Sequence, residues 1–132
     1  MAPTPEVYHF AQTRSVPNSK LPVLVYRDVL PRPHNEKTIE EFLERNQWLK
    51  GGAWGPVPRH HFHPNSHECY GIVPTYLRSP SKKFLAVFQG TSTLLIGVGP
   101  LEDPADGQQV HLRAGDLIVL PAGVAEMEER VL

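Results

Sequence analysis

The sequence predicts an all-β domain that carries one short helix. Fourteen prolines are spread along 132 residues, and each removes a backbone donor and clashes with the preceding helical turn, so long helices are excluded. Between the prolines lie short runs of β-branched and aromatic residues, which are typical of strands. Glycines, among them the Asp106-Gly107 pair, separate these runs as turns do. Strands and helices do not alternate along the sequence as they would in a protein with a parallel sheet.

The helix is predicted over residues 38–47. Thr38 and Glu41 form the T-x-x-E pattern of a capping box, and Ile39 and Leu43 begin an apolar face with helical spacing. The predicted strands are residues 23–26, 84–88, 91–98, 110–112 and 117–120.

Length and charge restrict the classes of function. The chain is long enough for one domain and not two, and we expect residues 1–132 to form that domain. The net charge of -1 argues against a nucleic-acid partner, because nucleic-acid binders usually carry a basic excess. No stretch approaches the roughly 18 apolar residues of a membrane span, and no secretory signal is visible. One cysteine fits a reducing compartment, so we expect a cytoplasmic protein.

A histidine cluster carries the predicted chemistry. In a strand, side chains alternate between faces, so His61 and His63 point the same way. Glu68, after a short turn, can complete a set of two histidines and one carboxylate, which suits Fe(II), Mn(II), Ni(II) or Zn(II). The alternative is a histidine-rich loop that binds no metal.

Two patterns resemble the paired motifs of the cupin family. His61, His63 and Glu68 form HxHx4E, and Gly115-x5-Pro121-x-Gly123 follows downstream. The resemblance covers residues 55–126 and implies a small conical β-barrel, or jelly roll, with a metal ion inside and a substrate entering at its mouth. Residues 1–50 would then form an N-terminal strand and helix extension.

Position 126 departs from the cupin pattern. Cupins usually have a histidine three residues after the glycine of Pro-x-Gly, and this chain has Glu126 there. Glu126 could be a fourth metal ligand, which would give the site one more negative charge than the usual set. Alternatively, it begins the charged run 126–130, which would face solvent as such runs usually do.

Spacing and length also depart from the pattern. Cupins usually have a glycine seven residues after the motif glutamate, and removing residues 73–87 would restore that spacing here. We therefore expect an insertion at 73–87, unless the gene model is imperfect. The chain ends soon after Glu126, so the resemblance implies a barrel that is incomplete at its C-terminus. Unpaired strand edges would favour a homodimer.

Four further residues attract specific expectations. His67 competes with Glu68 for the third ligand position, but the motif spacing favours Glu68 and leaves His67 as a candidate catalytic acid–base. Cys69 is expected to be a buried, unreactive thiol. Tyr70 could line the mouth of the pocket, although an aromatic residue in a small barrel is more often part of the core. Asp116 is expected to be an exposed charge beside a turn.

Three flanking segments, residues 21–27, 42–48 and 52–55, make the resemblance more specific. They are similar to small fungal and bacterial cupins, including cupin-domain oxidoreductases of fungal polyketide clusters that make salicylaldehyde-type products. This implies a metal-dependent oxidoreductase acting on a small organic molecule, with a polyketide synthase and dehydrogenases as pathway partners. No GxGxxG fingerprint of a nicotinamide or flavin is present. The alternatives are a non-redox cupin isomerase, cyclase or dehydratase, and a non-catalytic binding module.

Overall fold

The computed structural model describes residues 3–49, 53–54, 58–72, 85–86 and 91–129. Within these ranges the chain is mainly β-structure with one α-helix, α1 (Glu36–Arg45), so the all-β prediction is confirmed. No helix of the described part is both long and apolar enough to cross a membrane. The strands are β1 (Glu6–Phe10), β2 (Ser19–Tyr26), β3 (Ala53–Trp54), β4 (Glu68–Gly71), β5 (Leu85–Ala86), β6 (Thr91–Ile96), β7 (Gln108–Arg113), β8 (Leu117–Leu120) and β9 (Glu126–Glu129).

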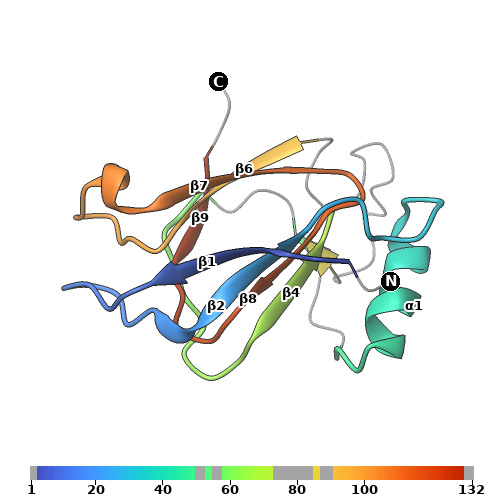
Figure 1. Cartoon of the computed structure of the whole chain (residues 1–132), viewed down its shortest axis with the longest axis horizontal. Coiled ribbons are helices and arrows are strands. Elements are labelled where there is room, and N and C mark those ends of the chain that lie inside the picture. Colours follow the sequence, from blue (N-terminus) through green and yellow to red (C-terminus); the bar gives the residue numbers. More distant parts are fainter. Residues whose placement is uncertain (1–2, 50–52, 55–57, 73–84, 87–90, 130–132) are drawn as a thin grey trace.

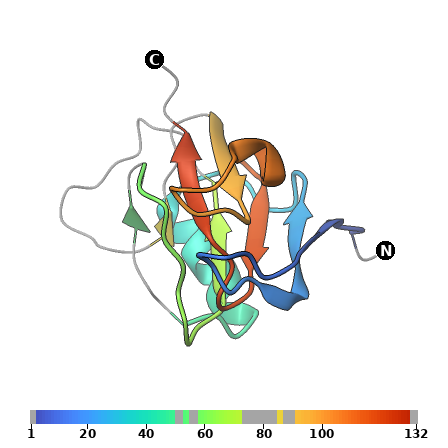
Figure 2. The ribbon, with the colours of Figure 1, turned by 90° about the vertical axis from the view of Figure 1, so that its left-hand side faces the viewer.

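Two antiparallel sheets organise the described part of the chain (Figure 1). One has the strand order β1-β2-β8-β4 and the other has the order β7-β6-β9, while β3 and β5 form a short parallel pair. Figure 2 gives the perpendicular view of the same strands. The two antiparallel sheets share one apolar core, so they pack face to face. Its buried members include Val23 and Val25 of β2, Ile118 and Leu120 of β8, Leu94 and Ile96 of β6, and Val110 and Leu112 of β7.

The helix begins earlier than the sequence predicts. Its N-cap is Asn35, whose side chain accepts a hydrogen bond from the Thr38 backbone N–H at 2.9 Å. The prediction that Thr38 caps the helix is therefore wrong, because asparagine three residues upstream satisfies the same free donor.

The helix covers the outer face of the four-stranded sheet. Ile39 and Leu43 are buried in a second core cluster with Leu117 of β8, and Cys69 of β4 packs against it. A side chain at Gly71 would force its neighbours to shift, because a Cβ there would lie 2.6 Å from Ile39 Cγ2. The helix therefore lies very close to β4, and the outward-facing positions of this strand are committed to that contact.

The last described strand, β9, contradicts the solvent-facing alternative for Glu126. Its residues alternate between buried and half-buried, with Glu126 and Glu128 only 5% and 6% exposed. Pairing with β6 explains this, because Glu126 lies opposite Ile96, which is fully buried in the core between the sheets. The predicted insertion at 73–87 lies outside the described residues, apart from the short strand β5.

Asp116 is not the exposed charge that the sequence suggests, since it is only 5% exposed. Its Oδ1 accepts the backbone N–H of Asp28 at 3.0 Å, and its Oδ2 accepts the N–H of Arg113 at 2.9 Å. The guanidinium of Arg27 lies 3.0 Å from the same Oδ2. One carboxylate thus joins the end of β2 to the turn between β7 and β8.

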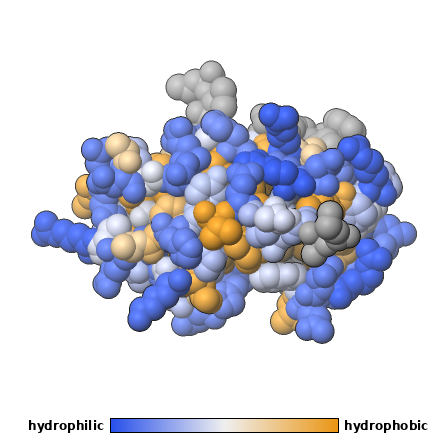
Figure 3. Space-filling model, in the orientation of Figure 1, coloured by the Kyte–Doolittle hydropathy of each residue, from blue (hydrophilic) through white to orange (hydrophobic). Residues whose placement is uncertain are grey.

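Among the described residues, the large exposed apolar side chains are scattered over the surface. In Figure 3 the visible face is mainly hydrophilic, with separate apolar patches between the polar side chains. The exposed large apolar residues are Val7, Leu21, Leu49, Phe62 and Leu101.

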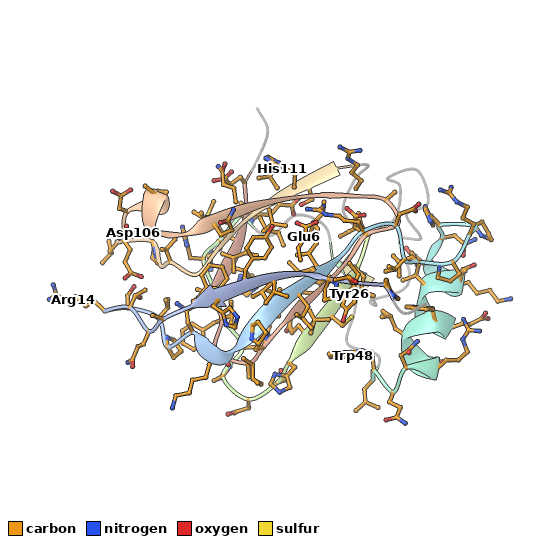
Figure 4. All side chains as sticks on the ribbon, in the orientation of Figure 1. Glu6, Arg14, Tyr26, Trp48, Asp106 and His111 are labelled. Atoms are coloured by element: carbon orange, nitrogen blue, oxygen red, sulfur yellow. The ribbon has the colours of Figure 1, made fainter. Side chains whose placement is uncertain are left out.

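Replacing Asp116 with alanine should lower the free energy of unfolding by about 3 kcal/mol, because it leaves two backbone donors and a partly buried cation without their acceptor. Urea denaturation measures this change. Asp106→Ala is the matched control, since Asp106 is exposed at the end of the molecule opposite Trp48 and α1 (Figure 4). A loss below about 1 kcal/mol for Asp116→Ala would contradict this assignment.

Candidate metal centre

A backbone bridge brings His61 and Glu126 together. The His61 N–H donates to the Glu126 carbonyl at 3.0 Å, and the Glu126 N–H donates to the His61 carbonyl at 2.9 Å. Residues that face each other in an antiparallel pair project their side chains on the same side. The Nε2 atom of His61 accordingly lies 3.1 Å from Glu126 Oε1. The two residues belong to one site although 65 positions separate them in the sequence.

His63 joins the same site. Its carbonyl accepts the Gly123 N–H at 2.8 Å, which holds the histidine segment against the Pro-x-Gly turn. The rings of His61 and His63 meet edge to face, with their centroids 5.3 Å apart. The two histidines therefore lie close together as expected, although neither belongs to a strand: His61 forms an isolated bridge and His63 lies outside any strand. His61, His63 and Glu126 each offer a ligand atom, and these atoms lie within 4.8 Å of one another, so the group could hold a metal ion.

Strand β4 supplies Glu68 from the other sheet. Glu68 lies opposite Leu120 of β8, and Tyr70 lies opposite Ile118. Because Leu120 and Ile118 are buried between the sheets, Glu68 and Tyr70 face that interior, while Cys69 between them faces the helix. The Glu68 Oε1 atom lies 2.7 Å from His63 Nε2.

Tyr70, for which the sequence favoured the core over the pocket mouth, belongs to the site. Its hydroxyl donates to Glu68 Oε2 and lies 3.0 Å from Glu126 Oε1, so it stands between the two carboxylates. Strand alternation could have predicted the place of Tyr70 in the site, because a residue two positions after Glu68 lies on the same face of the strand. The ring also packs against the core between the sheets, so the core assignment describes only part of its role.

One polar atom of the site has no hydrogen bond. His63 Nε2 is buried, and its short contact to Glu68 Oε1 does not have the direction of a hydrogen bond. A buried ring nitrogen without a partner is destabilising. A buried ring nitrogen close to carboxylate oxygens is an arrangement that a divalent cation would satisfy, so the donor set fits a metal ion.

The site also favours positive charge in its metal-free form. The hydrogen bond to Glu126 raises the pKa of His61 to about 9, although burial opposes this. Burial, and then the charge of Glu126, raises the pKa of Glu68 to about 7. Burial lowers the pKa of His63. A proton on His61 therefore stabilises the paired carboxylates, which is the role that a metal cation would take over.

The structure places His67 and Cys69 away from this group. His67 is exposed, and its Nδ1 accepts the Ala122 N–H at 2.9 Å, so it braces the turn that follows β8. Its catalytic role stays a prediction. Cys69 faces the helix, and burial raises the pKa of its thiol to about 12, which agrees with the expected unreactive thiol.

His67→Phe should lower the free energy of unfolding by about 1 kcal/mol, because the Ala122 N–H loses its acceptor. His67→Asn should restore most of that stability, since an amide oxygen can occupy the position of Nδ1. Urea denaturation and hydrogen exchange at the Ala122 amide measure both effects. Equal behaviour of the two variants would contradict this role for His67.

Comparisons with known proteins add one distant relative. No family model matches the chain, and no solved structure matches it. The chain is similar to a protein of Bacillus subtilis (strain 168) named "Uncharacterized protein YjlB", with 26% identity over 120 residues. The match covers 90% of this chain and 58% of that protein, so the chain spans less than two thirds of its relative's length.

Proposed function

We propose that this chain is a metal-dependent cupin enzyme that acts on a small organic molecule. In this proposal, the two facing sheets are the walls of a jelly-roll barrel. His61, His63, Glu68 and Glu126 hold one divalent ion, which is iron, manganese, nickel or zinc. The paired motifs support the family, and the convergence of their side chains supports the metal.

One observation carries the proposal most directly. Three ligand atoms from His61, His63 and Glu126 lie within 4.8 Å of one another, and the buried Nε2 of His63 has no hydrogen bond. When bound, the ion would act as a Lewis acid and as the coordination position for substrate or dioxygen.

The residues of the chain have separate tasks around that ion. The backbone bridge between His61 and Glu126 orients one ligand pair, and the Gly123 N–H orients His63 through its carbonyl. The Tyr70 hydroxyl donates a hydrogen bond to Glu68 and so fixes the orientation of that carboxylate. Hydrogen bonds to the residues that bind a metal directly typically orient those residues and strengthen metal binding.

The leading reaction class is an oxidation or reduction in secondary metabolism. It rests on the resemblance to cupin oxidoreductases of fungal polyketide clusters, whose products are of salicylaldehyde type. The described residues and the sequence provide no nicotinamide or flavin motif, so the electrons would pass to dioxygen or to a partner dehydrogenase.

A second candidate is a non-redox isomerase, cyclase or dehydratase. The specific observation that favours it is the Tyr70 hydroxyl, which lies within hydrogen-bond reach of both Glu68 and Glu126. A phenol between two carboxylates can hold or transfer a proton at its oxygen atom, as general acid–base catalysis requires.

The purified chain should bind one equivalent of a divalent transition metal, measured by elemental analysis and by calorimetric titration. His63→Gln and Glu126→Gln should each weaken binding by about a hundredfold, because each removes a direct ligand. His9→Gln is the matched control, since His9 is exposed on β1. Binding that survives both ligand substitutions unchanged would contradict the proposed metal centre.

Oxygen dependence should separate the two reaction classes. The metal-loaded chain is incubated with salicyl alcohol, as a small aromatic probe, in air and under argon. An oxidase should form salicylaldehyde only in air, with a matching uptake of oxygen. A product whose oxidation state equals that of salicyl alcohol, formed in the same yield in air and under argon, would favour the non-redox candidate.

A further inference from the structure

We infer that this site selects an uncharged molecule with hydroxyl groups and discriminates against carboxylates and other anions. The inference rests on the proposed metal centre and names the substrate class for it. It follows from the identity and the burial of the residue at position 126.

The charges of the ligands cancel the charge of a divalent ion. Histidines bind a metal as neutral imidazoles, so His61 and His63 add no charge. Glu68 and Glu126 bring one negative charge each, and together they neutralise the ion. A neutral residue at position 126 would leave the same centre with one net positive charge. Glu126 thus removes the electrostatic attraction that an anionic ligand would otherwise have.

The surroundings preserve this effect. Glu126 is only 5% exposed, so water screens its charge poorly. The hydroxyl of Tyr70 is already donated to Glu68, so this donor is not offered to an incoming anion. An anion bound to the metal would therefore lie next to two carboxylates, and neighbouring charges of the same sign repel each other.

The same carboxylates favour a ligand that brings its own hydrogen. Carboxylate oxygens accept hydrogen bonds and donate none. An alcohol or phenol can place its oxygen on the metal and direct its O–H at Glu68 or Glu126. A protonated amine has no lone pair for the metal. Hydroxyl groups without charge are therefore the chemistry that the site recognises.

Matched ligands on the cobalt-loaded protein test this inference. Salicyl alcohol and salicylate have the same phenol ring, but the first carries a hydroxymethyl group where the second carries a carboxylate. Azide serves as a simple anion. Changes in the visible absorption of Co(II) report ligand binding at the metal without any turnover. The wild-type chain should bind salicyl alcohol more tightly than salicylate.

Charge variants supply the decisive comparison. Glu126→Gln should raise the affinity for azide and salicylate about tenfold or more, because the centre gains one positive charge. It should change the affinity for salicyl alcohol much less. Glu129→Gln is the control, since it makes the same charge change at a half-buried position of β9 that alternates with the inward-facing Glu126 and Glu128. It should leave the affinity for azide unchanged.

The outcomes separate this inference from the proposed function. A wild-type chain that binds no cobalt would overturn the metal centre and this inference together. A chain that binds cobalt but prefers salicylate, or a Glu126→Gln variant with unchanged affinity for anions, would overturn the substrate class alone. If Glu126→Gln loses cobalt, Glu68→Gln makes the same charge change at the other carboxylate and gives the comparison.

Discussion

The backbone pairing of His61 with Glu126 is the constraint on which the rest of the site depends. Two reciprocal hydrogen bonds align a segment from the middle of the chain with its last described strand. Side chains that face each other in such a pair have no freedom to diverge, so an imidazole and a carboxylate meet inside the fold. The pairing of β9 with β6 then turns the Glu126 side chain toward the interior, where it is only 5% exposed.

The sequence predicted the site in part because strand periodicity is a local property. Alternation alone placed His61 and His63 on one side, and the same rule relates Tyr70 to Glu68. The position of Glu126 could not be decided in that way. A run of charged residues resembles a solvated surface, and only the partner strand shows that every second member faces inward. The expected exposure of Asp116 was wrong for the same reason. Its three hydrogen-bond donors come from distant segments or from the turn itself, and local sequence does not reveal them.

The fold was predictable where apolar runs are short and bounded by turns. The predicted strand at residues 117–120 matches β8, and the predicted residues 110–112 lie within β7. The strands β1, β4 and β9 were not predicted, since their sequences mix polar and apolar residues and depend on neighbours for their pairing. The start of the helix was misplaced because Asn35 and Thr38 are both good capping residues, and local spacing does not rank them.

The place of β2 in the sheet has a practical consequence for anyone who shortens this chain. The motifs fall within residues 55–126, which suggests that the preceding segment could be trimmed. However, β2 lies between β1 and β8, and Val23 and Val25 fill the core that both sheets share. A fragment without β2 would expose one edge of β8 and open the interior beside the histidines. The smallest useful expression product must therefore retain the N-terminal strands.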